Sequence, residues 1–152
     1  LPVAEKNNII LNVEVVNRFE QFLLNTANEA INYVDQIKHP NLKIHLDTFH
    51  MNIEENSFED AIVSTGDKLG NLHIGENNRK PPGEGSIINW DEIFRALKKI
   101  NYEGSIVMEP FIISGGTIAE DVKLWRDLGN TDDKSLDKRL KQSLEFVKRK
   151  LK

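Results

Sequence analysis

The sequence predicts an α/β fold in which four β-strands, each followed by a helical segment, form one parallel sheet. Short β-branched and apolar segments alternate with amphipathic segments along the whole chain, four times over. Strands that alternate with helices pair in parallel, because each helix carries the chain back to the starting edge of the sheet. A polar side chain also stands near the end of every strand segment, where such sheets gather their chemistry.

The strand segments are short, β-branched and apolar, and turn-forming residues flank them. In order they are residues 8–16, 42–47, 71–75 and 105–111. The helical segments carry apolar side chains three or four residues apart. In order they are residues 17–37, 57–70, 90–100, a helix from residue 117, and 134–151.

Capping residues predict where several helices begin. Ser57, with Asp60 three residues later, is expected to open the second helix, which stops at Gly70. Asn89 is expected to cap the helix over residues 90–100. Thr117 and Glu120 have the spacing of a capping box and predict the start of the next helix.

Composition limits the function classes. The chain has 152 residues, of which 39% are hydrophobic, enough for one compact domain with a core. The net charge of −4 leaves no basic stripe, so no nucleic-acid partner is expected. No apolar run reaches the length of a membrane span, and no signal-peptide pattern is present. The sequence has no cysteine, which excludes disulfides and thiolate sites and is compatible with a reducing cytoplasm.

Four polar residues occupy equivalent places in the four strands. Glu14, Asp47, His73 and Glu109 each lie at or near a strand end, and their neighbours in the strand are apolar. Because successive strand side chains point to opposite faces, all four are expected on one face of the sheet, with the apolar neighbours against the helices. Since the carboxyl ends of parallel strands meet at one edge, the four groups are expected to converge.

Three carboxylates and one imidazole form an oxygen-rich ligand set. Such a set suits Mn²⁺ or Mg²⁺, with Co²⁺ as another candidate, better than the Cys and His ligands of structural zinc. The alternative is that each residue is separately solvated or caps a helix. A shared parity in four strands favours the metal site over that alternative.

At these residues the chain resembles a known family. "VNRFE", "HLDTFHMNIEE", "NLHIGENNRKPPGEG" and "VMEPF" are similar to the motifs of the ketose 3-epimerases, which include D-tagatose and D-psicose (D-allulose) 3-epimerase. The resemblance runs from about residue 9 to residue 127, in the family's order and spacing. It implies a xylose isomerase-like TIM (β/α)₈ barrel that epimerises free ketohexoses at C3 with bound Mn²⁺, Co²⁺ or Mg²⁺.

The resemblance assigns a role to each matching position. It implies that Glu14 and Glu109 are metal ligands and catalytic acid/base residues, and that Asp47 and His73 are metal ligands. It also implies that three further residues hydrogen-bond the sugar: Glu20, His50 and Arg79. Taken alone, His50 reads as a loop histidine and Arg79 as a solvated charge.

The chemistry of epimerisation requires these residue types. Inverting C3 removes a carbon-bound proton beside the C2 carbonyl and returns a proton on the opposite face, so two carboxylates must flank the sugar. A metal bound to O2 and O3 would polarise the carbonyl and stabilise the cis-enediolate.

Several other residues are predicted to be structural. His45 shares the parity of Asp47 and is expected to be a buried support. Trp90 and Trp125 are expected on helices, in the core. The "GEGS" stretch at 83–86 is too short for a nucleotide loop.

Length is the departure from the family. A TIM barrel typically needs over ~200 residues, and the match covers only the last four βα units of the barrel. The sequence therefore predicts that residues 1–152 are the C-terminal half of a single barrel domain, either part of a longer protein or a half-barrel that associates with another. Open sheet edges would otherwise be exposed.

Alternative functions remain open. One is a sugar or sugar-phosphate isomerase of the same superfamily, for which "NNRKPPGEGS" offers basic residues but no helix N-terminal cradle. The other is an inactive half-barrel that binds metal or sugar, or only assembles. Related zinc-dependent abasic-site endonucleases are disfavoured by the low count of 4 histidines and the acidic balance.

Overall fold

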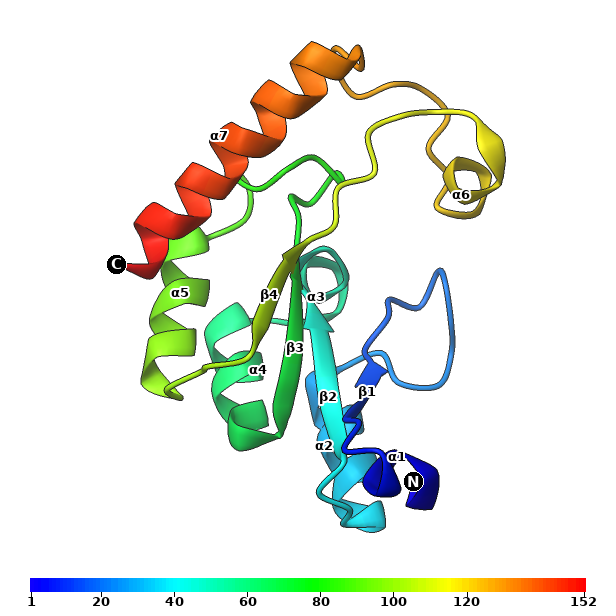
Figure 1. The fold of residues 1–152 in the computed structure, drawn as a ribbon, viewed down its shortest axis with the longest axis vertical. Helices are drawn as coiled ribbons and strands as arrows, with labels where there is room; N and C mark the ends of the chain where they lie inside the picture. The colour runs from blue at the N-terminus through cyan, green and yellow to red at the C-terminus, as the bar shows by residue number, and fades with distance from the viewer.

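A computed structural model describes residues 1–152 and contains one four-stranded parallel sheet (Figure 1). The strands are β1 (Leu11–Glu14), β2 (Leu42–Asp47), β3 (Leu69–Ile74) and β4 (Ser105–Met108). They lie in the sheet in the order β1-β2-β3-β4, with each neighbouring pair parallel. The predicted fold of sequential βα units is confirmed.

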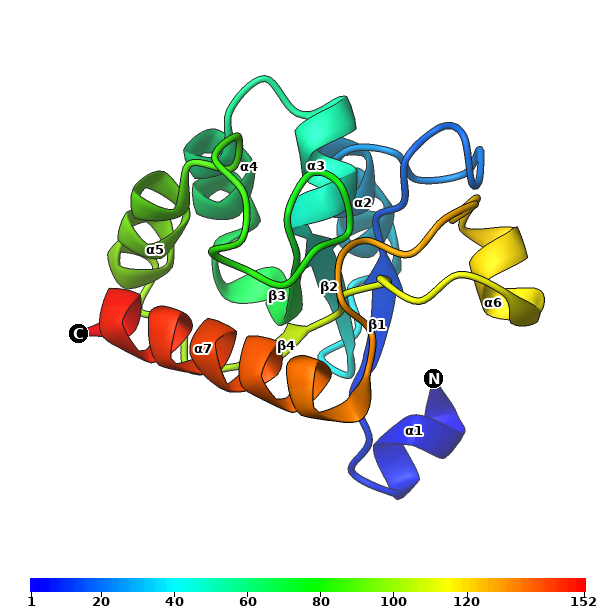
Figure 2. The ribbon, with the colours of Figure 1, turned by 90° about the horizontal axis from the view of Figure 1, so that it is seen from above.

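Seven α-helices accompany the sheet, and Figure 2 shows α2, α4 and α5 following one another around its outer side. The helices are α1 (Pro2–Lys6), α2 (Ala27–Ile37), α3 (Thr48–Glu54), α4 (Phe58–Thr65), α5 (Trp90–Lys99), α6 (Gly116–Asp121) and α7 (Asp133–Leu151). A 3₁₀ turn, η1 (Gly66–Lys68), links α4 to β3. None of them is long and apolar enough to cross a lipid bilayer.

The core lies between the sheet and the surrounding helices. Ile44, Leu46, Leu72 and Ile74 point from β2 and β3 into this layer and are completely buried. Burying a side chain of this size contributes roughly 1.5–3 kcal/mol. The alternate positions of the same strands carry the polar residues, so the apolar layer fixes which face the site occupies.

Helix starts follow the expected caps in two places. The Ser57 hydroxyl accepts from the Asp60 amide at the start of α4, and the Asn89 side chain accepts from the Glu92 amide at the start of α5. The capping box predicted at 117–120 is wrong. Gly115 precedes α6 and no side chain caps that helix.

Several predicted boundaries are also wrong. The helix expected over residues 17–37 begins only at Ala27, because side chains bond the backbone in the segment before it. There, the Asn17 side chain accepts from the Phe19 amide and the Asn25 amide group donates to Val16 O, which satisfies the backbone without a helix. The first and last strands are shorter than expected, since they span only Leu11–Glu14 and Ser105–Met108.

Further differences concern short helices and one tryptophan. Helices α1 and α3 were not expected from the sequence, and α4 ends at Thr65, before the predicted stop at Gly70. Trp90 is buried as expected. The prediction for Trp125 is wrong, since it lies outside the helices and 71% of its surface is exposed.

Candidate metal and active site

The four residues predicted at the strand ends lie at the carboxyl end of the sheet. Glu14 is the last residue of β1, Asp47 is the last of β2, and His73 is the second-last of β3. The register places Asp47 directly opposite His73. Glu109 follows β4, and its amide donates to Ile74 O at 3.1 Å, so the chain keeps strand pairing one residue beyond β4.

Asp47 occupies the junction between β2 and α3. Its Oδ1 accepts from the Phe49 amide at 2.7 Å and so caps α3. The Thr48 hydroxyl donates to Gly75 O at 2.7 Å and accepts from the Gly75 amide at 2.9 Å. These bonds hold the ends of β2 and β3 together beneath the polar groups.

Three of the four predicted ligands are close enough to share an ion. Asp47, His73 and Glu109 each offer a ligand atom within 4.8 Å of the others. His73 Nδ1 lies 3.2 Å from Glu109 Oε1 and 3.9 Å from Asp47 Oδ2. Glu14 falls within the same distance in two overlapping groups, one with Asp47 and His50 and one with His45 and His73.

The pKa values of two carboxyl groups in the cluster are raised. Burial, followed by the negative charges of Asp47 and Glu109, raises the pKa of Glu14. Burial also raises the pKa of Asp47, although His50, the Phe49 amide and Arg79 act in the opposite direction. Burial lowers the pKa of His50 and therefore favours its neutral form.

The cluster fits a divalent cation. His73 Nδ1 is buried and makes no hydrogen bond, although Glu109 Oε1 lies 3.2 Å away, as expected of a nitrogen and an oxygen that both face a shared cation. The donor set is carboxylate oxygens with one imidazole nitrogen, which suits Mn²⁺, Co²⁺ or Mg²⁺. A cation would also offset the burial, and the repulsion from Asp47 and Glu109, that raise the pKa of Glu14.

The three residues predicted to bind sugar lie beside this cluster. Arg79 Nη2 donates to Glu20 Oε1 at 3.3 Å, and Arg79 Nη1 lies 3.5 Å from Glu109 Oε2 and 3.9 Å from Asp47 Oδ2. The Asn17 amide group lies 2.7 Å from His50 Nδ1 and 3.0 Å from Glu20 Oε1. Asn17 thus joins Glu20 to His50, and Arg79 joins Glu20 to the carboxylates.

Arg79 is held by its surroundings on both sides. Its guanidinium lies over the Phe49 ring at 3.7 Å from the centroid and 5.0 Å from that of Phe111. Its backbone has a φ of 65°, a left-handed conformation that is costly for a residue other than glycine. Only 7% of its surface is exposed, so it is not a solvated surface charge.

Three residues of the site were not singled out from the sequence. Asn17, Phe49 and Phe111 lie inside the quoted motifs "VNRFE", "HLDTFHMNIEE" and "VMEPF", but neither periodicity nor charge marks them. His45 is buried as expected, and its ring meets the His73 ring edge-on at 3.9 Å between centroids. Burial, then the nearby His73 and His50, lowers the pKa of His45 to about 4.

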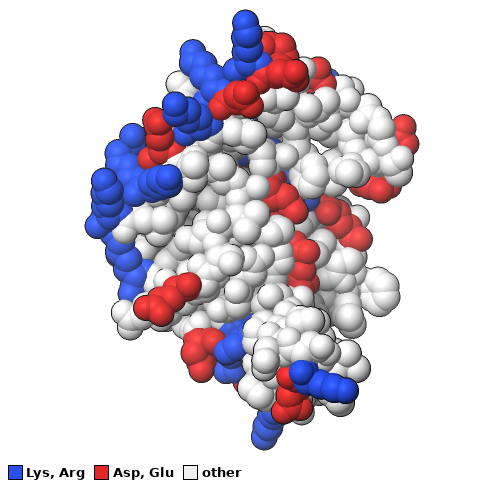
Figure 3. All heavy atoms as spheres, viewed as in Figure 1, with Lys and Arg blue, Asp and Glu red and all other residues white.

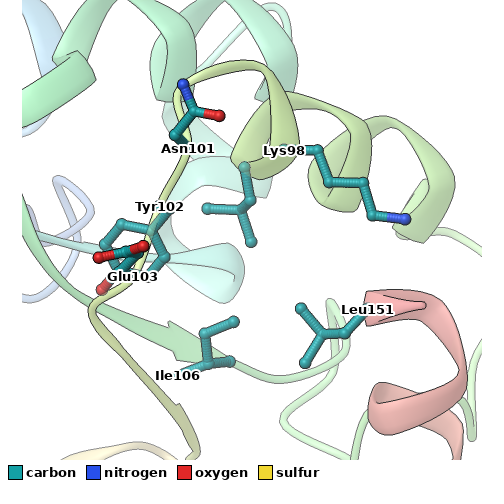
Figure 4. Close-up of a pocket in the computed structure, with 7 residues that line it drawn as sticks. Lys98, Asn101, Tyr102, Glu103, Ile106 and Leu151 are labelled. Atoms are coloured by element: carbon teal, nitrogen blue, oxygen red, sulfur yellow. The ribbon is translucent and has the colours of Figure 1, made fainter.

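The largest cavity is elsewhere in the molecule. It has a volume of about 460 Å³, and Figure 4 shows its lining between the end of α5, the start of β4 and the end of α7. Its polar lining groups are Lys98, Asn101, Tyr102 and Glu103, and the Tyr102 hydroxyl already donates to Ser105 O. This cavity holds no catalytic constellation, so the strand ends are the candidate site.

Charge is distributed unevenly around the molecule. Figure 3 shows Lys and Arg gathered along the edge where α5 and α7 lie, with acidic atoms in the middle of the same face. Part of the basic charge is neutralised within the fold, since Arg139 pairs with Glu84 and Lys150 pairs with Asp91. Arg79 is the arginine that enters the carboxylate cluster.

Comparison with known proteins identifies the family. The family model described as "Xylose isomerase-like TIM barrel" matches residues 1–149. The chain belongs to this family. Its resemblance to the ketose 3-epimerases is confirmed by the relatives of the chain within this TIM-barrel family.

Relatives among the TIM-barrel enzymes match the chain closely. D-psicose 3-epimerase of Enterocloster bolteae is 51% identical over 146 residues, which are 95% of this chain and 48% of that protein. The crystal structure of D-psicose 3-epimerase with D-tagatose from Clostridium cellulolyticum H10 superposes with a TM-score of 0.96 at 49% identity, over 99% of this chain and 52% of that one. D-allulose 3-epimerase from Methylomonas sp. superposes with a TM-score of 0.90 at 37% identity, over 99% of this chain and 51% of that one.

The chain spans about half the length of the relatives it matches. The four strands of this sheet are half of the eight in a (β/α)₈ barrel. The number of strands therefore agrees with the half of each relative that the chain covers.

Proposed function

We propose that this chain supplies the metal-binding and acid/base residues of a ketose 3-epimerase, and that residues 1–152 correspond to the C-terminal half of one TIM-barrel domain. The observation that carries the proposal is the cluster at the strand ends. Asp47, His73 and Glu109 have ligand atoms within 4.8 Å of one another. Glu14, at the end of the first strand, comes as close to Asp47 and to His73. The names of the relatives, D-psicose and D-allulose 3-epimerase, support the reaction class.

Four residues would hold the metal: Glu14, Asp47, His73 and Glu109. Mn²⁺ is the first candidate, with Co²⁺ and Mg²⁺ as alternatives, because the donor set is mainly carboxylate. When bound, the ion would polarise the C2 carbonyl of the ketose and stabilise the negative charge that develops on the sugar oxygens.

Glu14 and Glu109 would move the protons. Inversion at C3 takes a proton from one face of the carbon and returns one to the other, so two groups are required. Glu14 ends the first strand of the sheet and Glu109 directly follows the last, on either side of Asp47 and His73. One carboxylate accepts the C3 proton while the carboxyl group of the other donates, and the roles exchange in the reverse direction.

Glu20, His50 and Arg79 would orient the sugar. Arg79 can only donate hydrogen bonds, whereas Glu20 only accepts them when ionised, so together they match hydroxyl groups. Asn17 fixes the spacing of the acceptors, since it contacts both Glu20 and His50. Phe49 and Phe111 support the Arg79 guanidinium from the protein side.

The test is turnover in heavy water. The purified chain, supplied with Mn²⁺, is incubated with D-psicose, and the products are separated and examined for deuterium. Formation of D-fructose with deuterium at C3 is the expected result, because the protons held by the glutamates exchange with solvent. An aldose product would indicate an isomerase instead. Absence of any product with Mn²⁺, Co²⁺ or Mg²⁺ would refute epimerisation by residues 1–152 alone.

A further inference from the structure

One buried carboxylate lies outside the cluster of ligand and sugar residues. Glu76 follows β3 and opens the loop over residues 76–88; it has no exposed surface, and its Oε2 has no hydrogen-bond partner. Burying a carboxylate without full pairing is costly, so its presence in this loop needs a physical reason.

The other oxygen of Glu76 ties the loop together. Oε1 accepts from the Gly83 amide at 2.7 Å and from the Trp90 indole Nε1 at 2.9 Å. Gly83 lies in the middle of the loop and Trp90 is the first residue of α5. One carboxylate therefore connects the start of the loop to its middle and to the next helix.

The remaining oxygen of Glu76 is packed against Gly85. A Cβ atom at Gly85 would collide with Glu76 Oε2, so the loop accepts only glycine there while the carboxylate stays in place. Gly85 does not have a positive φ, so its backbone can accept alanine, and the three nearest atoms to a Cβ there all belong to the Glu76 side chain.

The same residue closes the turn that carries Arg79. Glu76 O accepts from the Arg79 amide at 3.0 Å, and the Glu76 amide donates to Lys80 O at 2.9 Å. Arg79 adopts a left-handed backbone inside this turn, a conformation that is strained for a residue other than glycine and persists only when its surroundings impose it. The backbone of residue 76 makes these two bonds, while the Glu76 side chain ties the turn to Gly83 and Trp90, and together they supply that constraint.

We propose that Glu76 is a positioning residue that fixes the guanidinium of Arg79 beside Glu20, Asp47 and Glu109. Its side chain closes the loop, the closed loop imposes the left-handed turn, and the turn directs Arg79 inward between Phe49 and Phe111. The link from Arg79 to the sugar rests on the proposed function, whereas the link from Glu76 to Arg79 does not.

Chemical protection of Arg79 tests the second link directly. Phenylglyoxal modifies accessible arginines, and peptide mapping by mass spectrometry measures each one separately. In the unsubstituted chain Arg79 is expected to react far more slowly than Arg126, which is exposed.

In Glu76→Ala and in Gly85→Ala, Arg79 is expected to react at the rate of Arg126. Glu76→Gln keeps an oxygen for Gly83 and Trp90 and is expected to restore most of the protection. Ser86→Ala, next in the loop and exposed, is the matched control and should leave Arg79 protected.

The outcomes separate positioning from general stability. If Glu76 merely stabilised the fold, Glu76→Ala would lower the melting temperature and leave Arg79 protected, which would overturn the proposal. If Glu76→Ala fails to fold, Gly85→Ala decides, because it displaces the carboxylate without removing it. Continued protection of Arg79 in that variant would also overturn the proposal.

Kinetics test the link to the sugar. Misplacement of a group that contacts the substrate can lower the reaction rate by up to about a hundredfold. Glu76→Ala is therefore expected to raise KM for D-psicose severalfold, with a smaller change in kcat. The double variant Glu76→Ala/Arg79→Ala should be no worse than Arg79→Ala alone, and additive effects would contradict the proposed link. If the unsubstituted chain epimerises no ketose, the proposed function fails, while the protection experiment still decides the role of Glu76.

Discussion

Asp47 performs two structural tasks with its two carboxylate oxygens. Oδ1 caps α3 through the Phe49 amide, and Oδ2 faces His73 and Arg79. Replacement by asparagine keeps an oxygen for the cap but removes the negative charge and one ligand oxygen. We expect Asp47→Asn to fold and to lose Mn²⁺ binding, measured by calorimetric titration. Asp67→Asn, an exposed position, is the control and should bind as the unsubstituted chain does. Unchanged Mn²⁺ affinity in Asp47→Asn would exclude Asp47 as a ligand.

Arg79 and Glu109 should fail in different ways when substituted. Arg79 only donates hydrogen bonds, so Arg79→Ala is expected mainly to raise KM for the ketose. Glu109 would have to exchange a proton, so Glu109→Gln is expected to abolish turnover while sugar still binds. Steady-state kinetics with a separate sugar-binding titration distinguish the two. A Glu109→Gln chain that turns over at a near-normal rate would defeat the acid/base assignment.

Which of these residues could be predicted follows from strand geometry. Glu14, Asp47, His73 and Glu109 share one parity, and a period of two fixes the face of a strand side chain without knowledge of the fold. No such periodicity predicts the positions of Phe49 and Glu76, which lie outside the strands. The Phe49 ring lies under the Arg79 guanidinium, and the Glu76 carboxylate bonds Gly83 and Trp90 across a loop; these contacts exist only after the loops have folded.

At the scale of elements, an ion pair joins the loop after β1 to α3. The Glu54 carboxylate accepts from the Arg18 guanidinium and from the Arg18 amide at 2.8 Å. Hydrogen bonds from the Arg18 side chain, then from its amide, lower the pKa of Glu54 to about 2. Because this pKa lies below the unfolded value of 4.5, the pair stabilises the folded chain above about pH 4.5 and the gain is lost as pH falls toward 2.

Glu54→Gln should reveal this dependence. The difference in free energy of unfolding between the unsubstituted chain and Glu54→Gln is expected to be largest above pH 4.5 and to shrink as the pH is lowered toward 2. Glu103→Gln replaces an exposed glutamate and provides the baseline. A difference that stays constant over this range would rule out a contribution from the ionised pair.

The start of α2 offers a second test of an element. Thr26 and Glu29 form a reciprocal capping box, although helical spacing predicts both residues in the interior of a longer helix. Thr26→Ala is expected to lower the free energy of unfolding by about 1 kcal/mol, measured by urea denaturation. Asn28→Ala, an exposed position two residues further on, should have a smaller effect or be slightly stabilising.

Periodicity predicted the long elements and failed at the short ones for a physical reason. Residues 17–37 show continuous helical spacing, but side-chain bonds to the backbone from Asn17 and Asn25 stabilise a loop up to Thr26. Helix α3 is only 7 residues long and depends on the Asp47 cap and on the Thr48–Gly75 bonds rather than on an apolar stripe. Long-range contacts of this kind are invisible to a local pattern.

At the scale of the whole molecule, both outer strands leave an edge unpaired. β1 and β4 are the first and last strands of the sheet, and each has a neighbour on one side only. Apolar side chains near these edges are exposed, including Ile9, Ile10, Leu11 and Val107. In a closed (β/α)₈ barrel such edges pair with further strands, whereas in water they form a template for association.

We therefore expect this chain not to persist as a lone monomer in its functional form. Sedimentation at micromolar concentration should show species larger than the 17.4 kDa chain, with the average mass rising with concentration. Leu11→Lys and Val107→Lys place a charge at each edge and should shift the distribution toward the monomer, because charged edges oppose strand pairing. Glu103→Lys, which reverses a charge outside the strands, is the control and should change the distribution less. A folded, monodisperse monomer of 17.4 kDa with both edges exposed would show that the edges do not drive assembly.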